Sequence, residues 1–277
     1  MSGLKTRIIS AFAALILILA SYFYAGRLGL TVLAGMIVLV GIYEYSQIAL
    51  APLKLPRGYN VWFVLLCASA TASVVVAKHS SFLILGFAAS LYLSGAMWID
   101  RKGVENISVW RFLTIGLFGL VYFGTFAAAA VKILATPQGE RWFALLLGIV
   151  FAGDIAAYFG GKAFGKTKLM PEVSPGKTLA GSVSGVAGSI VASVLLAQMV
   201  LPHLAIWFLV VMAAVAAFFG QSGDLLISLI KRIANVKDSG KIMPGHGGVL
   251  DRLDGVILAA PTIYAAMVYS DLLLNMI

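Results

Sequence analysis

Four acidic residues lie in places where a carboxylate is costly or crowded. Asp154 sits in the apolar run FAGDIAAYFGGK, and Asp224 sits in FFGQSGDLLISLIKR. Asp251 and Asp254 are three residues apart, a spacing that puts both side chains on one face of a helix. A carboxylate in an apolar helix needs a polar cavity and a partner, and two carboxylates on one face repel unless a cation separates them. We therefore expect these acids to bind a cation or a substrate.

The ligand chemistry of these acids favours Mg²⁺, alone or with a second cation. Asp224, Asp251 and Asp254 offer hard oxygen ligands, and the sequence has no cluster of His and Cys that would suit Zn²⁺. Asp154 is a further candidate metal ligand. Because Mg²⁺ usually arrives with phosphates, we expect a nucleotide or pyrophosphate substrate.

Each acid also has a simpler interpretation. Asp154 and Asp224 could make a hydrogen bond or salt bridge between packed helices, for example to Lys162 or Lys231. Asp251 and Asp254 could be solvated acids that interact with the positive end of a helix. These alternatives stay open at the level of sequence.

Basic residues and glycines accompany the acids, as a phosphate site requires. Lysine and arginine neutralise phosphate, and glycine lets backbone N–H groups approach it closely. The residues of this kind near the last acids are Lys231, Arg232, Lys237, Lys241, His246, Gly247, Gly248 and Arg252. The segment GKAFGKTKLMPEVSPGKTLAG adds Ser174, Lys177 and Thr178. Two alternatives stay open: basic residues near helix ends also anchor helices at interfaces, and His246 either donates to a phosphate or caps a turn.

Several common enzyme classes are disfavoured. The sequence has no GxxxxGK[ST] loop of ordinary nucleotide hydrolases, no Ser-His-Asp order and no HExxH helix. Cys67 is the single cysteine, so an intrachain disulfide is impossible, and its apolar surroundings indicate a small buried side chain.

The elements that position these residues must be membrane helices. Of the 277 residues, 61% are hydrophobic and 11% are charged, with a mean hydropathy of +1.00, whereas soluble domains carry roughly 25% charged residues. We therefore predict an all-α, polytopic integral membrane protein. Nine apolar segments have spanning length, near 8–24, 28–50, 60–77, 81–99, 110–132, 142–161, 181–201, 204–234 and 250–276.

The distribution of basic residues orients these segments. If the N-terminus lies in the cytoplasm, only Arg27, Lys78, Lys132 and Arg141 fall on the opposite side, which leaves 16 of the 20 basic residues in the cytoplasm. The formal net charge of +9 then reflects this bias and attraction to anionic lipid or nucleotide. No basic run with interleaved aromatic residues indicates nucleic-acid binding, so we expect no nucleic-acid partner.

The chain divides into two regions of different character. Residues 1–141 are mostly apolar helices, predicted to be a scaffold with possible oligomer contacts, and Glu44 is one of their few acids. Residues 142–277 hold the candidate site and form the predicted catalytic region. The segment 204–234 would make a helix of about 46 Å at 1.5 Å per residue, longer than a hydrocarbon core of about 30 Å. We expect it to tilt, bend near Gly220 and Gly223, or protrude into the cytoplasm.

One segment carries a specific family resemblance. Residues Ser228 to Asp254 read SLIKRIANVKDSGKIMPGHGGVLDRLD, and we call them the signature segment. This segment resembles the signature of the phosphatidate cytidylyltransferases, which are also called CDP-diacylglycerol synthases. It agrees at every fixed position with their pattern S-x-x-K-R-x(4)-K-D-x-G-x(3)-P-G-H-G-G-x-x-D-R-x-D. QSGDL at 221–225 and SPGKTLAG at 174–181 also resemble family segments, with Gly176 as a mild departure.

The resemblance implies an activity and roles for residues. The reaction would convert CTP and phosphatidic acid, taken from the bilayer, into CDP-diacylglycerol and pyrophosphate with Mg²⁺. Independently of the resemblance, the compact length without a targeting extension favours a prokaryotic inner (plasma) membrane, and the distribution of basic residues places the site on the cytoplasmic side. The implied catalytic residues are Asp224, Asp251, Asp254, Lys231 and Arg232. The implied substrate-binding residues are Ser174, Lys177, Thr178, Ser228, Lys237, Asp238, Lys241, His246, Gly247, Gly248 and Arg252. Asp238 would orient either Lys241 or Arg252, and we expect a homodimer in contact with membrane lipids.

Two other functions would use similar residues. A CTP-dependent polyprenol kinase, or a cytidylyltransferase for an ether lipid, uses similar helices, and a kinase would release CDP in place of pyrophosphate. An ion or solute transporter would instead use the intramembrane acids as a cation path. Transport sites usually lie near the midplane, whereas the acids here are predicted at one membrane edge beside a glycine-rich loop.

Overall fold

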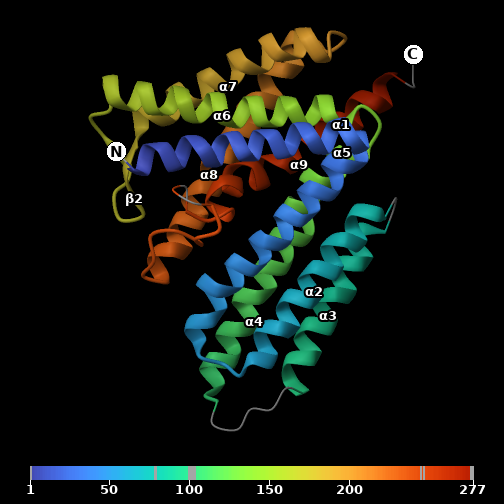
Figure 1. Ribbon diagram of the computed structural model, residues 1–277, viewed down its shortest axis with the longest axis vertical. Coiled ribbons are helices and arrows are strands. Elements are labelled where there is room, and N and C mark those ends of the chain that lie inside the picture. Colours follow the sequence, from blue (N-terminus) through green and yellow to red (C-terminus); the bar gives the residue numbers. More distant parts are fainter. Residues whose placement is uncertain (1, 78–79, 99–103, 244, 246, 275–277) are drawn as a thin grey trace. The chain divides into compact units, whose positions relative to one another are not determined.

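The computed structural model describes residues 2–77, 80–98, 104–243, 245 and 247–274, which are almost entirely helical (Figure 1). The chain forms two compact units. The first unit contains Met1–Ala135 and Ile230–Arg252, and the second unit contains Thr136–Leu229 and Leu253–Ile277. These units differ from the predicted regions 1–141 and 142–277, because residues 230–252 group with the N-terminal helices. The functional division into scaffold and catalytic region stays a prediction.

The N-terminal part of the first unit is almost entirely helical in the residues that the structure describes. Its elements are α1 (Ser2–Tyr45), η1 (Ser46–Leu50), η2 (Ala51–Leu53), α2 (Arg57–Val76), α3 (Ser81–Trp98), α4 (Asn106–Val121), η3 (Tyr122–Ala127) and α5 (Ala128–Ala135). In α1, Gly26 has φ 56° and ψ −141°, a conformation outside the helical region that only glycine adopts easily. The predicted segments 8–24 and 28–50 therefore become two helical arms of α1 that meet at a kink.

Aromatic side chains fill the core of the first unit. Tyr45 packs against Phe63 and Phe123, with ring centroids 5.9 and 5.7 Å apart. The Tyr45 hydroxyl donates to the carbonyl of Ile115 at 2.8 Å, which satisfies a buried polar group. At Gly119 an added Cβ would lie 2.6 Å from the Tyr45 ring, so the absence of a side chain allows this close packing. Cys67 is buried, as predicted.

The second unit contains the remaining helices and one small hairpin. Its elements are α6 (Gly139–Phe164), β1 (Lys168–Met170), β2 (Ser174–Thr178), α7 (Leu179–Val200), most of α8 (Ile206–Ile233) and most of α9 (Leu250–Leu274). The antiparallel strands pair Lys168 with Thr178 and Met170 with Ser174. Helices α6 and α7 approach closely through small residues: a Cβ at Gly153 would lie 2.4 Å from Ser189 Oγ. Such small residues are typical of membrane helix interfaces.

The glycines of α8 serve packing. An added Cβ at Gly223 would lie 2.3 Å from the backbone oxygen of Asp254, and one at Gly220 would lie 3.4 Å from the oxygen of Gly255. These contacts bring α8 and α9 together within the second unit. The structure shows Gly220 and Gly223 within the single helix α8 at a contact with α9, and a bend there stays a prediction.

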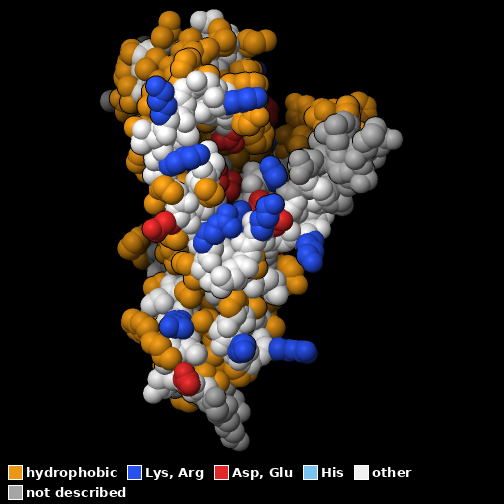
Figure 2. All heavy atoms as spheres, turned by 90° about the vertical axis from the view of Figure 1, so that its left-hand side faces the viewer, with side chains coloured by type: hydrophobic (Ala, Val, Ile, Leu, Met, Phe, Trp, Pro, Cys, Tyr) orange, Lys and Arg blue, Asp and Glu red, His pale blue; other side chains and the backbone are white. Residues whose placement is uncertain are grey.

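The helices have the dimensions of membrane spans. Eight helices in the described ranges are long and apolar enough to cross a membrane, and the first of them, Phe12–Leu53, includes the kink at Gly26. The count differs from nine because two predicted segments share α1. Large apolar side chains such as Phe82 and Trp98 are 86% and 90% exposed, and Figure 2 shows hydrophobic side chains over much of the visible surface. The multi-pass membrane fold is confirmed.

Candidate active site

Lys231 and Asp251 form the central ion pair of the first unit. Lys231 lies in the last turn of α8, and Asp251 lies in the first turn of α9. Lys231 Nζ lies 2.6 Å from Asp251 Oδ1, and both side chains are largely buried, with 14% and 8% exposed. The other oxygen, Oδ2, accepts the backbone N–H groups of Ser239 at 2.8 Å and Gly248 at 3.0 Å. Asp251 is thereby fixed from three sides and holds the lysine in one position.

The loop between α8 and α9, residues 234–249, is shaped by its glycines. Gly245 and Gly247 have φ of 78° and 83°, which favours glycine. The N–H of Met243 donates to the carbonyl of Gly247 at 3.1 Å, which closes a tight turn. Gly248 was predicted to offer its amide to a phosphate, and the structure shows this amide bonded to Asp251. The predicted residue His246 lies outside the described residues.

Several charged residues close to Lys231 and Asp251 in the sequence are exposed. Arg232, Lys237, Lys241 and Arg252 are all exposed, as expected for residues that meet a soluble nucleotide or a lipid phosphate. Asp238 is also exposed, and its Oδ1 lies 3.2 Å from the position of an added Cβ on Gly247. The role of Asp238 in orienting Lys241 or Arg252 stays a prediction.

Sequence reasoning assigned no site role to Glu44, which the structure places against the same loop. Glu44 lies near the end of α1 and is 2% exposed. Its carboxylate accepts hydrogen bonds from Ser239 Oγ at 3.0 Å, the Val249 N–H at 3.1 Å and the Leu250 N–H at 2.8 Å. The position of Glu44 in an apolar segment could have predicted a structural role, because a buried carboxylate needs hydrogen-bond partners.

A second lysine–aspartate pair lies in the second unit. Lys177 Nζ, on β2, lies 2.6 Å from Asp224 Oδ2 on α8, and these side chains are 27% and 39% exposed. Ser228, one turn further along α8, donates to Asp224 Oδ1 at 3.3 Å. Asp224 thus pairs with Lys177, and not with Lys231 as the packing alternative suggested. The predicted residues Lys177, Ser228 and Asp224 are gathered in one place.

The last residue of β2 caps the start of α7. Thr178 is buried, and its Oγ1 accepts the N–H of Gly181 at 3.1 Å, which makes it the N-cap of α7. Ser174 lies at the other end of β2 and is half-buried. Thr178, predicted as a triphosphate contact, therefore has a structural role that its sequence context did not reveal.

Gln221 links α7 and α8 next to the second pair. Its side-chain oxygen accepts from Ser182 Oγ, and its Nε2 donates to the Ser182 carbonyl at 3.0 Å. Gln221 precedes Asp224 by three residues, so both lie on one face of α8. The two-point contact fixes the rotation of α8 against α7 and so helps to aim Asp224 at Lys177.

Asp154 and Asp254 occupy different surroundings in the second unit. Asp154, on α6, lines a small cavity together with Ser189 and Gln221, so it has polar neighbours. Asp254 is 9% exposed, and its Oδ1 accepts the N–H of Gly255 at 2.8 Å. In the described ranges, no group of three His, Cys, Asp or Glu side chains is arranged to hold a metal ion. The three-carboxylate metal site stays a prediction.

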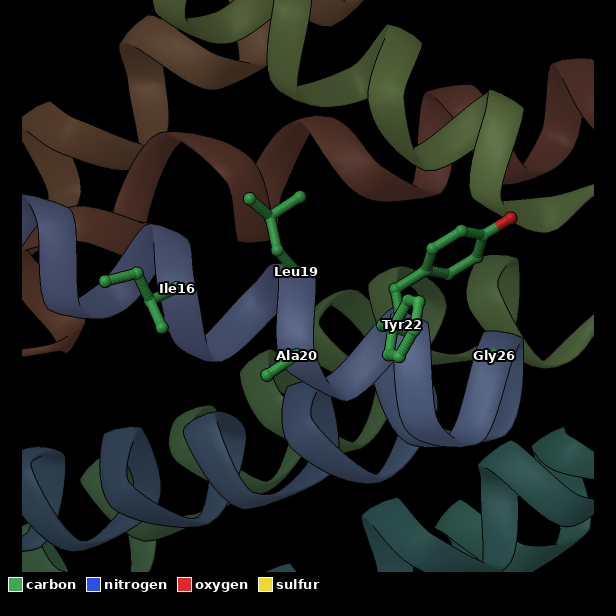
Figure 3. Close-up of a pocket in the computed structure, with 6 residues that line it drawn as sticks. Ile16, Leu19, Ala20, Tyr22 and Gly26 are labelled. Atoms are coloured by element: carbon green, nitrogen blue, oxygen red, sulfur yellow. The ribbon is translucent and has the colours of Figure 1, made fainter.

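A larger hollow along the first arm of α1 has a different character (Figure 3). It is lined by Ile16, Leu19, Ala20, Tyr22, Phe23 and Gly26. None of these side chains carries a charge, so this hollow lacks the groups that would neutralise a triphosphate. The charged candidates instead form two separate groups, the Lys231–Asp251 pair in the first unit and the Lys177–Asp224 pair in the second.

Comparison with known proteins identifies the family. The sequence profile described as the Cytidylyltransferase family matches residues 5–270. The chain belongs to this family. Members with 30–33% identity over nearly full length carry one name, phosphatidate cytidylyltransferase. The Brucella suis protein is 33% identical over 95% of this chain and 93% of its own length. The Pseudomonas aeruginosa protein is 30% identical over 96% and 97%, and the Bacillus subtilis protein is 30% identical over 95% and 97%.

The family match extends beyond the signature segment. The resemblance first rested on residues in the C-terminal half, whereas the matched residues begin at position 5. The N-terminal helices therefore belong to the family as well. The predicted family and the predicted membrane fold are both confirmed.

Proposed function

We propose that this protein transfers the cytidylyl group of CTP to phosphatidate and produces CDP-diacylglycerol and pyrophosphate. The observation that carries this proposal is the near full-length similarity to proteins named phosphatidate cytidylyltransferase. The two lysine–aspartate pairs fit the chemistry, because the reaction brings together a triphosphate and an anionic lipid. Exposed cations also lie near the Lys231–Asp251 pair in the sequence, at Arg232, Lys237, Lys241 and Arg252.

The reaction is a displacement at phosphorus. An oxygen of the lipid phosphate forms a bond to the α-phosphorus of CTP, and the bond from that phosphorus to its bridging oxygen breaks. Pyrophosphate leaves with the electron pair. The lipid phosphate is already an anion near neutral pH, so no strong general base is required. Catalysis then consists mainly of positioning and charge neutralisation.

Each aspartate orients its lysine for binding phosphate. A lysine ammonium has three N–H donors, and the described contacts of Lys231 use one of them on Asp251. The remaining donors suit phosphate oxygens. Asp251 restricts the lysine to one orientation, so less side-chain entropy is lost when substrate binds. Lys177 is held in the same way by Asp224, and we assign both lysines to phosphate binding.

We further propose Mg²⁺ as the cofactor. Mg²⁺ is usually held by one or two carboxylates together with substrate phosphates, so a cage of three carboxylates is not needed. Asp224 fits this description because it is a hard oxygen ligand with 39% of its side chain exposed. When bound, Mg²⁺ would neutralise charge on the triphosphate and on the departing pyrophosphate.

The location of the site in the cell is also a proposal. We place the protein in the inner (plasma) membrane with the site facing the cytoplasm, where CTP is available. The bias of 16 of 20 basic residues toward one side, counted with the two arms of α1 on either side of Gly26 as separate crossings, supports this orientation. Labelling of single cysteines introduced at Lys54 and Arg141, in a Cys67→Ala background, should react from opposite sides of the membrane. A homodimer is proposed as well and is measured by light scattering of the detergent-solubilised protein.

The activity is tested by product analysis. Purified protein is incubated with CTP and phosphatidate, with and without Mg²⁺. We expect CDP-diacylglycerol and pyrophosphate in equal amounts, and only in the presence of Mg²⁺. Release of CDP with a phosphorylated lipid would instead identify a kinase and overturn the proposal. Activity near the wild-type level in both Asp224→Asn and Asp251→Asn would overturn the assigned site.

A further inference from the structure

Glu44 is a buried carboxylate whose partners all belong to the loop between α8 and α9 or to the first turn of α9. The residue is 2% exposed. A charged carboxylate in such a place is costly unless hydrogen bonds compensate it. Within the described part of the chain its partners are three donors and no cation: the hydroxyl of Ser239 and the backbone N–H groups of Val249 and Leu250.

Glu44 caps α9 from a distant part of the sequence. The N–H groups of Val249 and Leu250 lie where α9 begins, and N–H groups at the start of a helix have no partner inside the helix. A carboxylate at this end also interacts favourably with the helix dipole. Most helices receive such a cap from a neighbouring residue, whereas α9 receives it from a residue about 205 positions earlier. Glu44 therefore determines where the first turn of α9 lies.

The same two loop residues connect Glu44 to Asp251. Ser239 donates its hydroxyl to Glu44 and its backbone N–H to Asp251. Gly248 donates its N–H to Asp251, and a Cβ added to it would lie 2.6 Å from Glu44 Oε2. Ser239 is thus bonded to both carboxylates, Gly248 lies beside both, and Asp251 in turn holds Lys231. A movement of Glu44 would be transmitted to the ion pair through Ser239 and Gly248.

Two glycines of the signature segment make room for this carboxylate. An added Cβ at Gly240 would lie 2.1 Å from Glu44 Oε1, and one at Gly248 would lie 2.6 Å from Oε2. Real side chains essentially never approach so closely. A side chain at Gly240 would therefore collide with Glu44, and one at Gly248 would collide first with Ser239 Oγ, 1.9 Å from the added Cβ, and then with Glu44. Contact with Glu44 thus explains Gly240, and contact with both Glu44 and its partner Ser239 explains Gly248.

We infer that Glu44 is a positioning residue that sets the geometry of the Asp251–Lys231 pair. The inference rests on the proposed function for its effect on catalysis, while its structural part stands independently. Glu44 does not touch the reacting atoms in this scheme. It acts through the loop and through the first turn of α9.

The first experiment replaces Glu44 by glutamine. The Glu44→Gln side chain has nearly the same shape, but one of its ends becomes an N–H donor facing an N–H or O–H donor. We expect kcat to fall about 10- to 100-fold, the range seen when outer partners of site ligands are removed, with a smaller change in KM for CTP. The control is Tyr92→Phe, which removes a buried hydrogen bond to the Phe112 carbonyl in the same unit and should leave kcat unchanged.

Two further readouts separate positioning from general destabilisation. Hydrogen exchange of the peptide covering 236–252 should become faster in Glu44→Gln and stay unchanged in Tyr92→Phe. This readout does not depend on activity, so it remains informative if the proposed reaction is not observed. In an Asp251→Asn background, Glu44→Gln should have little additional effect on kcat, because residues that act through one another are not additive.

A steric test covers the case in which Glu44→Gln does not fold. Gly240→Ala should lower kcat at least tenfold in the wild-type protein, because its new methyl group collides with Glu44. In a Glu44→Ala background the same change should have less than a twofold effect, since the colliding oxygen is gone. Unchanged exchange in 236–252 together with full additivity of Glu44→Gln and Asp251→Asn would overturn the inference, as would equal effects of Gly240→Ala in both backgrounds.

Discussion

Lys231 and Asp251 lie 20 residues apart in the sequence, and their charged atoms are 2.6 Å apart. The lysine lies in the last turn of α8 and the aspartate in the first turn of α9. The pair therefore joins the two ends of the loop that carries most of the signature segment. Because both side chains are largely buried, removal of one partner leaves the other charge without compensation. The pair is therefore expected to matter both for catalysis and for the shape of the loop.

The first prediction concerns the Lys231–Asp251 pair. Lys231→Met should lower kcat about 100- to 1000-fold, the loss typical of removing one group that stabilises charge in the transition state. Lys231→Arg keeps the charge with a different shape and should retain part of the activity. CDP-diacylglycerol formation from radiolabelled CTP measures the effect. The exposed Lys54→Met is the control, and an equal loss in that variant would point to a general effect of charge.

The second prediction separates the roles of Lys177 and Asp224. Lys177→Met should raise KM for CTP about tenfold, because one charged contact to phosphate is worth roughly 1.5 kcal/mol or more. Asp224→Asn should raise the Mg²⁺ concentration that gives half-maximal activity. Initial rates over a grid of CTP and Mg²⁺ concentrations measure both quantities. An unchanged Mg²⁺ dependence in Asp224→Asn would remove this residue from the proposed metal site.

The third prediction concerns the contact between α8 and α9. Gly223→Ala should lower Tm, because the added Cβ would lie 2.3 Å from the backbone oxygen of Asp254 and overpacking costs about 1–3 kcal/mol. At an exposed helical position the same change would stabilise the helix by up to about 1 kcal/mol. Gly86→Ala is the matched control, since Gly86 is an exposed position of α3 where an added Cβ meets nothing within 4 Å. Equal Tm values for both variants would contradict the packing at Gly223.

The fourth prediction concerns the cap of α7. Thr178→Ala should destabilise the protein by about 1 kcal/mol through loss of the hydrogen bond to the Gly181 N–H. Thr178→Ser keeps the oxygen and should restore most of that stability. Thermal unfolding in detergent and KM for CTP are measured for both variants. If Thr178→Ala lowers Tm and leaves KM for CTP unchanged, a direct role of Thr178 in triphosphate binding is contradicted.

Much of the protein could be predicted from local pattern. The apolar segments identified the membrane helices because lipid requires about 20 apolar residues per crossing, and those limits do not depend on tertiary contacts. The signature segment identified the family because its fixed polar residues occur at fixed spacings. The kink at Gly26 was harder to predict, since an isolated glycine between apolar segments is compatible with either a loop or a bent helix.

The candidate site depended on contacts that spacing does not reveal. The sequence determined by itself that acids and lysines gather near the last helices, and that the chain belongs in a membrane. Only the tertiary structure decided that Asp224 pairs with Lys177, that Asp251 pairs with Lys231, and that Glu44 caps α9. The physical reason is that helix periodicity determines which face of a helix a side chain occupies. The partner that meets this face comes from a distant segment, and its identity is set by how the helices pack.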